Sequence, residues 1–324
     1  MIEAARYAHV ARLLGQQQHV AKLYQHAEQG YKKYADQYIF GGDKKPEFHA
    51  FVADRLASSL RNGAIYAGHG STSRMDLKKQ WEKIAAIPFH SHRDEARDMI
   101  KNYESLIKED VAWKEPNAKE LAKLTTEQKV SYWLYHLRDL DVGQWSDPGH
   151  CYVLGGRFGF FMSDEEEKKT PNAAVELKKL GMAAIPQFIA HLDDGRPTRC
   201  KGHWRSYWPE GHYLLPYGDC CQQVFEAITG KTIHASGGYP MRDGKGTQCK
   251  ELAERWWQEY QKKGEKQMLI EGTAAGNRDS SGHAQRLVEK YPEAALTPVI
   301  EGIRASTDKD VHPAATEWQT MPES

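Results

Sequence analysis

The stretch PNAAVELKKLGMAAIPQFIAHLDDGRPTRC, residues 171–200, decides the fold. Its apolar residues recur three and four positions apart in two consecutive runs, which is the spacing of one buried face on an α-helix. Gly181 lies between the runs, where a helix end favours a residue that can adopt a positive φ. Pro186 falls in the first turn of the second run, where its missing N–H costs little. The pattern predicts two short antiparallel helices with a shared apolar seam.

A third amphipathic run follows in YGDCCQQVFEAITGK, residues 217–231, and predicts a helix from Asp219 to Thr229. Because its apolar residues keep the helical spacing, we expect the three helices to bury one common core. The side chains expected in that core are Leu180, Ile185, Phe188, Ile189, Val224, Phe225 and Ile228.

These helices together resemble a HEAT-like repeat over residues 171–231. The residues that carry the resemblance are Leu180-Gly181, Ala184-Ile185-Pro186, Phe188-Ile189, Leu192-Asp193-Asp194, Arg199 and Ala227-Ile228-Thr229-Gly230. The chain departs from the repeat by inserting about twenty residues between the helices of the hairpin, where short connections are usual. The resemblance implies an α-solenoid element, a class that usually binds other macromolecules, and it implies no chemistry.

The N-terminal part resembles one tetratricopeptide repeat. Residues 2–38 carry alanines and tyrosines at helical spacing, and the matching positions are Leu14-Gly15, Ala27 and Tyr31. The first tryptophan and the closing proline of that family are absent, so a plain helical hairpin is the alternative. One such unit cannot bury its own apolar face, and neighbouring helices must complete it.

The rest of the chain is also predominantly helical in pattern. Ser73 predicts one helix start, and Thr125 with Gln128 predicts another through a capping box. Glycine and serine between Gly63 and Ser73 predict a loop. The ranges with helical periodicity are 47–62, 73–88, 91–112, 125–137, 248–262, 266–275 and 282–304.

We therefore expect an all-α fold of packed helical hairpins, α-solenoid-like, with long aromatic and glycine-rich loops. Strands are expected at most as a short hairpin near residues 150–162. Three regions are predicted: an N-terminal helical, tetratricopeptide-like region at 1–138, an aromatic and glycine-rich linker at 139–170, and a HEAT-like helical-repeat region at 171–324.

Composition restricts the possible functions. Lys plus Arg and Asp plus Glu number 44 each, and this balance argues against a dedicated nucleic-acid binder. No apolar run approaches the roughly 20 residues that a membrane helix needs, and no signal peptide is visible. Five cysteines, an odd number without framework spacing, favour a reducing compartment such as the cytoplasm. We expect a protein partner and no cofactor.

The insertion CKGHWRSYWPEGHYLLPY, residues 200–217, is the predicted recognition surface. Long insertions in helical hairpins lie at the surface, and tryptophan, tyrosine and arginine predominate in binding hot spots. The predicted binding residues are Arg199, His203, Trp204, Arg205, Tyr207, Trp208 and His212. The alternative is that the aromatic side chains fold back and cover the end of the helical core.

Two residue sets have a metal-like composition. Cys200, His203, His212 and Cys220 could form a tetrahedral zinc site, but they lack two paired half-motifs, and cysteines on a helix also pack as small hydrophobes. We therefore predict no bound metal and keep zinc as the alternative. The string His90-x-His92-x-Asp94 follows a proline after a helix, so we expect it to begin the next helix rather than to catalyse.

No phosphate-binding loop, nucleotide-binding glycine fingerprint or nucleophile elbow is present in the sequence. The leading hypothesis is therefore a non-catalytic protein-interaction or scaffold module built on HEAT-like repeats. The alternative is an enzyme or enzyme domain, such as a zinc-dependent hydrolase, that uses the His/Cys/Arg insertion at 200–221.

Overall fold

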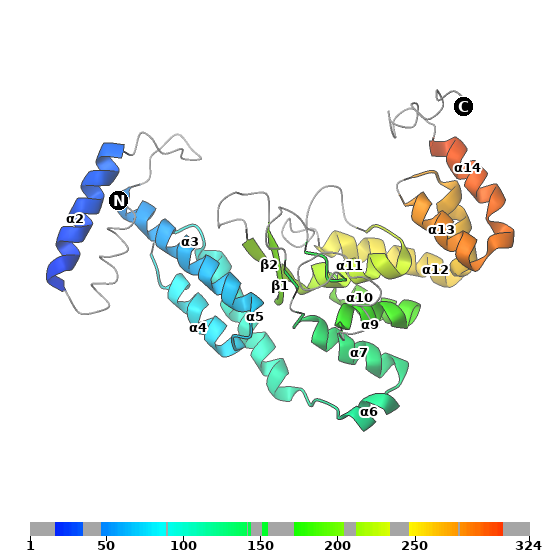
Figure 1. Cartoon of the computed structure of the whole chain (residues 1–324), viewed down its shortest axis with the longest axis horizontal. Coiled ribbons are helices and arrows are strands. Elements are labelled where there is room, and N and C mark those ends of the chain that lie inside the picture. Colours follow the sequence, from blue (N-terminus) through cyan, green and yellow to red (C-terminus); the bar gives the residue numbers. More distant parts are fainter. Residues whose placement is uncertain are drawn as a thin grey trace, which may run out of the picture.

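The computed structural model describes residues 17–34, 47–88, 90–140, 142–143, 151–154, 172–203, 212–233, 246–277 and 279–306. This part of the chain is mostly helical and contains one two-stranded antiparallel sheet, so the all-α prediction is confirmed at this level. Helix α2 lies at one end of the long axis of the molecule and α14 at the other, and the sheet lies between α3–α5 and α7–α11 (Figure 1). The α-solenoid arrangement stays a prediction.

The N-terminal helices are α2 (Gln17–Tyr34), α3 (Phe48–His69), α4 (Arg74–Ala85) and α5 (Arg93–Ala112). Tyr31 of α2 packs on two phenylalanine rings of α3, with centroid distances of 5.5 and 5.0 Å. Ala27 and Tyr31 are buried, whereas Leu14-Gly15 lies outside the described residues, so the tetratricopeptide resemblance stays a prediction.

Helix α3 is longer than expected, and the loop predicted from Gly63 to Ser73 is wrong over its first part. The helix continues through Gly63 because Ala64 and Ile65 are buried on the same core as Ala57, and this burial outweighs the low helix propensity of glycine. Large side chains fill the core between α3, α4 and α5. They are Ile65, Leu77, Trp81, Ile84, Tyr103 and Leu106.

Both predicted helix caps are present. The Ser73 side chain accepts a hydrogen bond from the Asp76 N–H at the start of α4. Thr125 and Gln128 form a reciprocal capping box at the start of α7 (Thr126–Leu137), which follows the short α6 (Ala118–Lys123).

The predicted HEAT-like segment forms α9 (Ala173–Leu180), the 3-10 turn η2 (Gly181–Ala184), α10 (Ile185–His191) and α11 (Tyr217–Thr229). Gly181 has the expected positive φ of 62°, and Pro186 lies in the first turn of α10. The expected common core is confirmed. Ile185, Phe188, Ile189, Val224, Phe225 and Ile228 are buried in it, and Leu180 packs against it.

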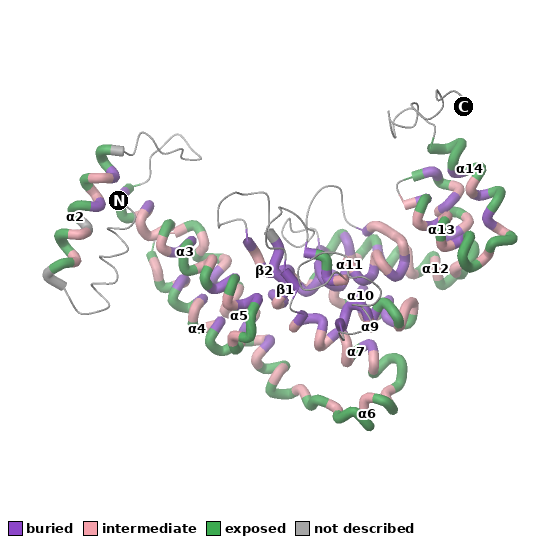
Figure 2. Tube along the Cα trace, viewed as in Figure 1, coloured by how far each residue is buried: buried purple, intermediate pink, exposed green. Residues whose placement is uncertain are grey.

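Helix α7 also contributes to this second core, through Val130, Leu134 and Leu137. The buried residues therefore gather where α7, α9, α10, α11 and the sheet meet (Figure 2). This core continues on both sides of the predicted boundary at residue 138, while the division into three regions stays a prediction.

The described sheet lies in the insertion, so the expectation of strands at most near residues 150–162 is wrong. Residues 150 and 155–162 of that range lie outside the described part. Strand β1 (Pro197–His203) pairs antiparallel with β2 (His212–Pro216), with Gly202 opposite Tyr213 and His203 opposite His212. The register shifts between Pro197 and Lys201, as in a β-bulge. The chain forms strands here because β2 can bury side chains on both of its faces.

The C-terminal elements are α12 (Gly246–Ala274), α13 (Ser280–Lys290), the 3-10 turn η4 (Pro292–Ala294) and α14 (Leu296–Ser306). Gly264, at φ 77° and ψ 166°, interrupts α12 between the two expected ranges 248–262 and 266–275. Within the described ranges, no helix is both long and apolar enough to cross a membrane.

Candidate functional site

The β1–β2 hairpin lies between the two helical cores. Leu214 belongs to the core of α3, α4 and α5, and Leu215 belongs to the core of α7, α9, α10 and α11. Successive residues of a strand point to opposite faces, so one strand can contribute to both cores. Strand β2, at the end of the predicted recognition insertion, therefore joins two parts of the fold.

Arg199 is held at the base of this hairpin. Its guanidinium donates hydrogen bonds to the carbonyl oxygens of Gly68 (3.3 Å), Gly70 (2.5 Å) and Thr72 (3.1 Å). It also donates to Asp139 Oδ1 at 2.9 Å. The last carbonyls of a helix have no partner within the helix, so Arg199 satisfies the C-terminal end of α3. These contacts give Arg199 a structural role, and its predicted role in binding stays untested.

Lys201 is buried completely, although lysine is rarely found inside a protein. Its Nζ lies 4.1 Å from the centroid of the Tyr66 ring, in cation–π geometry. Burial lowers the pKa of Lys201 to about 8. The Tyr66 hydroxyl in turn lies 3.2 Å from His212 Nε2, which brings α3, β1 and β2 together in one polar contact. The sequence carries no sign that Lys201 is buried, because its burial depends on strand β1, which was not predicted, and on Tyr66 of the distant helix α3.

The outer end of the hairpin is the pair His203 and His212. His212 is buried, and its carbonyl oxygen accepts a hydrogen bond from Arg61 at 3.3 Å. The remaining predicted binding residues lie outside the described part of the chain. They are Trp204, Arg205, Tyr207 and Trp208.

Four cysteines are buried in the second core: Cys151, Cys200, Cys220 and Cys221. Cys200 donates a hydrogen bond from Sγ to the Leu140 carbonyl oxygen at 3.6 Å, and Cys220 Sγ lies 3.7 Å from Thr198 Oγ1. Burial raises the pKa of the Cys220 thiol well above its ordinary value, whereas hydrogen bonds from the Cys151 and Cys220 thiols lower the pKa of Cys200. The two cysteines therefore interact with each other and with backbone carbonyls in the core. In the described residues, no group of three or more His, Cys, Asp or Glu side chains could hold a metal ion.

The string His90-x-His92-x-Asp94 lies at the start of α5, as its sequence context indicated. His92 immediately precedes the helix and contacts Ser58 Oγ at 3.0 Å through Nε2. Asp94 and Glu95 occupy the first turn, where a negative charge is favourable. Two hydrogen bonds from Arg61, at 2.9 and 2.7 Å, hold Glu95 against α3.

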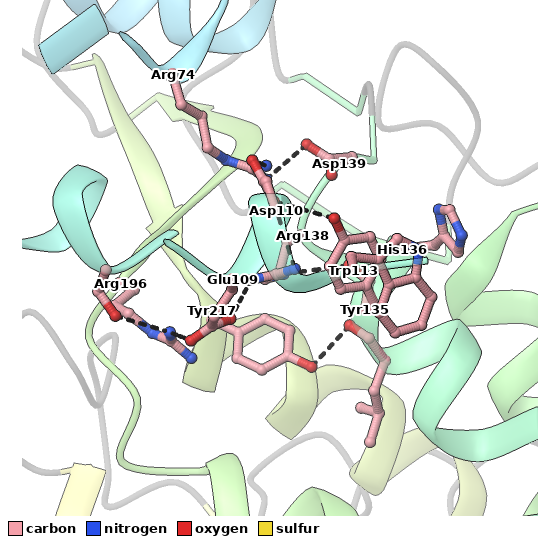
Figure 3. A network of polar contacts seen from close by, with 12 residues as sticks. Arg74, Glu109, Asp110, Trp113, Tyr135, His136, Arg138, Asp139, Arg196 and Tyr217 are labelled. Carbon is pink, nitrogen blue, oxygen red and sulfur yellow. Dashed lines mark hydrogen bonds and ion pairs between the residues drawn. The ribbon is translucent and has the colours of Figure 1, made fainter. Parts of the chain in front are cut away.

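An extended network of arginines and carboxylates connects α4, α5, the residues that follow α7 and the residues at the start of β1 (Figure 3). Arg138, which is almost fully buried, donates to Glu109, and Arg74 donates to Asp110 and to Asp139. Arg196 donates to Glu109 and to the carboxylate of its near neighbour Asp194. The Tyr135 hydroxyl donates to Asp110 at 3.0 Å, beneath the stacked ring of Trp113.

The charges of this network balance within the protein. Its cations are Arg74, Arg138, Arg196 and Arg199, and its anions are Glu109, Asp110, Asp139 and Asp194. The ion pairs join α4, α5, α7 and β1, so the network stabilises the arrangement of the helices around the hairpin. Paired charges of this kind offer no surplus charge to a substrate.

Comparisons with protein-family models, with curated proteins and with solved structures find no match to this chain. The HEAT-like and tetratricopeptide-like resemblances therefore rest on the residues that carry them.

Proposed function

We propose that this chain is a non-catalytic protein-interaction or scaffold module that presents the outer end of the β1–β2 hairpin to a partner protein. The observation that carries the proposal is the anchoring of the hairpin base. Leu214 and Leu215 enter two different cores, and Arg199 binds the end of α3. Because the two strands are already held in place, they need no further ordering when a partner binds.

The composition of the joining segment supports the same function. Residues 204–210 read WRSYWPE and connect His203 to His212. Tryptophan, tyrosine and arginine supply most of the binding energy in protein interfaces, because they combine a large apolar area with hydrogen-bonding groups. The base of the hairpin is anchored by Leu214, Leu215 and Arg199. The fold of the base therefore does not depend on the tryptophan, tyrosine and arginine residues of 204–210, which are available for recognition.

The test is site-specific photo-crosslinking in extract of the source cells. A photoreactive amino acid at Ser206 should give a discrete crosslinked product with one partner protein. Replacing Trp204, Tyr207 and Trp208 together with alanine should abolish that product, and circular dichroism should show the folded helical content of the parent protein. Tyr152→Ala, which changes a half-exposed tyrosine elsewhere, is the matched control and should leave the product intact.

Two results would contradict the proposal. Crosslinking that persists in the folded triple variant would place recognition elsewhere. Loss of folding in the triple variant, and in the milder Trp204→Phe and Trp208→Phe variants, would identify the aromatic side chains as a structural lid.

A further inference from the structure

Three of the five cysteines of the chain meet at one point in the second core and form a thiol cluster. Cys151 precedes α9, Cys200 lies on β1 and Cys220 lies on α11, and all three side chains are fully buried. The sulfur of Cys200 is in hydrogen-bonding contact with the sulfur atoms of Cys151 and Cys220. Buried cysteine often packs as a small hydrophobe, but packing alone does not require that three thiols from distant segments contact one another.

The backbone on either side of the Cys151–Cys200 contact is held by a shared acceptor. The carbonyl oxygen of Val142 accepts a hydrogen bond from the Lys201 N–H at 2.9 Å and another from Cys151 Sγ at 3.4 Å. The Gln223 side chain of α11 holds the same segment by donating to the Cys151 carbonyl oxygen at 2.8 Å. Contacts other than the one between their sulfur atoms therefore keep Cys151 and Cys200 side by side.

Cys220 is the weaker partner of Cys200. Its Sγ lies 3.7 Å from Oγ1 of Thr198, and the same hydroxyl accepts a hydrogen bond from the Cys200 N–H at 3.1 Å. The contact with Cys200 is the largest cause of the raised pKa of Cys151, whereas burial is the largest cause for Cys220. The strongest contact within the thiol cluster is therefore the one between Cys151 and Cys200.

We propose that Cys151 and Cys200 are a peroxide-sensitive dithiol, which hydrogen peroxide converts to a disulfide bond within the folded chain. The inference goes beyond the proposed interaction with a partner protein and does not depend on it. The disulfide ties the segment 151–154 covalently to β1, the strand that carries the base of the hairpin. Exchange with a small thiol reductant restores the two cysteines.

Cys200 is the sulfur that reacts first. Hydrogen bonds from its two neighbours lower its pKa, and the thiolate is the nucleophilic form of cysteine. The Cys200 thiolate attacks one oxygen of hydrogen peroxide and the O–O bond breaks. The hydroxide that leaves takes up the thiol proton, so the products are a sulfenic acid and one water.

Cys151 completes the reaction. Its sulfur attacks the sulfenic sulfur of Cys200, so an S–S bond forms while the S–O bond breaks. The oxygen leaves as a second water and carries the Cys151 proton. Two thiols and one hydrogen peroxide therefore give one disulfide and two waters, and the two sulfur atoms supply the electrons that reduce the peroxide.

Burial determines which oxidants can reach this pair. Both thiols are fully buried, so a bulky disulfide reagent is kept out by the packed core. Hydrogen peroxide is uncharged and not much larger than water, and it can enter through local opening of the fold.

Peptide mapping of the full chain after peroxide treatment tests the proposal. The reduced protein is exposed to hydrogen peroxide in its folded state, the remaining thiols are alkylated in denaturant, and a tryptic digest is analysed without reduction. Trypsin places Cys151, Cys200 and Cys220 on three separate peptides, so mass spectrometry identifies each pairing. The chain should lose two of its five thiols, and the linked product should be the Cys151–Cys200 pair.

Variants and denaturant show whether the fold directs the pairing. Cys151→Ala and Cys200→Ala should each abolish the loss of two thiols. Cys249→Ala is the matched control, because it removes a buried thiol outside the thiol cluster and should leave the Cys151–Cys200 bond intact. In urea, the same treatment of the parent protein should scatter disulfides among the five cysteines.

Three results would overturn the proposal. The folded chain could form no disulfide under peroxide, or a Cys200–Cys220 bond could form in place of the Cys151–Cys200 bond. A mixture of pairings equal to that found in urea would show that the fold does not bring the two thiols together. Mapping of the parent protein distinguishes these results even where an alanine variant fails to fold.

Discussion

Leu214 and Leu215 are adjacent in the sequence, but their side chains enter different hydrophobic cores. Leu214 packs beside Gly68 of α3, and a Cβ atom on that glycine would lie 2.7 Å from the Leu214 side chain. Leu215 is fully buried with α7 and α9 to α11. Strand β2 therefore couples the two helical parts of the chain through two neighbouring residues.

This relationship predicts that the effects of the two leucines on stability are independent. Leu214→Ala and Leu215→Ala should each lower the free energy of unfolding by about 2–5 kcal/mol, because each leaves a cavity in a packed core. The double variant should equal the sum of the two within about 0.5 kcal/mol, since the side chains share no core. Urea unfolding measures all three, with Leu60→Ala, at a half-exposed position of α3, as a near-neutral control. A coupling energy above about 1 kcal/mol would contradict separate cores.

Local signals in the sequence predicted much of the helical structure. Ser73, Thr125 and Gly181 each determine a helix end through groups within a few residues, so their roles can be read without the fold. The extension of α3 through Gly63 could not be predicted in this way, because it depends on burial against helices distant in sequence. The strand pair also escaped prediction, since the two apolar residues of β2 look like one short run until both cores are known.

The sequence identified the segment that forms the candidate site, but it did not predict how the residues of that segment are placed in the fold. The insertion was singled out correctly as a distinct element between helices, yet its first residues form a strand anchored in the fold. Arg199 was grouped with the binding residues because arginine favours interfaces, whereas its guanidinium lies against the end of α3. Lys201 carried no local signal, because the residues that enclose it come from segments far apart in the sequence.

The contacts of Arg199 predict that lysine cannot replace it. Arg199→Lys should lower the free energy of unfolding by about 1–3 kcal/mol, because an ammonium group cannot reach Asp139 and the carbonyls of α3 together. Arg97→Lys is the control, since Arg97 forms an exposed pair with Asp94 at 3.6 Å. Denaturant unfolding should separate the two variants, and an unchanged stability of Arg199→Lys would contradict the capping role.

Two helical glycines should respond in opposite ways to alanine. At Gly63 a Cβ atom would meet nothing within 4 Å, so Gly63→Ala should stabilise α3 by about 0.5–1 kcal/mol. At Gly218, in the first turn of α11, a Cβ atom would lie 2.6 Å from the Leu192 carbonyl oxygen, so Gly218→Ala should destabilise the protein by about 1–3 kcal/mol. Thermal unfolding compares them. A melting temperature that rises in both variants would show that α11 can move away from Leu192.

The buried amine of Lys201 predicts a specific dependence of stability on pH. Its pKa is lowered from 10.5 to about 8 by burial, so between these values the unfolded chain binds more protons than the folded chain. Below about pH 8, Lys201 therefore lowers the free energy of unfolding by its full amount. This loss of stability shrinks as the pH rises from about 8 to about 10.5.

Lys201→Met isolates this contribution, because methionine is an unbranched apolar side chain that can fill the same space. Urea unfolding at pH 7, 8, 9 and 10 should find the variant more stable than the parent protein at pH 7, with the difference shrinking toward pH 10. Subtracting the two curves cancels the tyrosines and cysteines that titrate in the same range. Lys79→Met, at an exposed lysine of α4, should instead give a difference that stays constant with pH. If the Lys201→Met difference were equally constant, the amine would keep an ordinary pKa. The ring of Tyr66, 4.1 Å from Nζ, would then stabilise the ammonium ion enough to offset its burial.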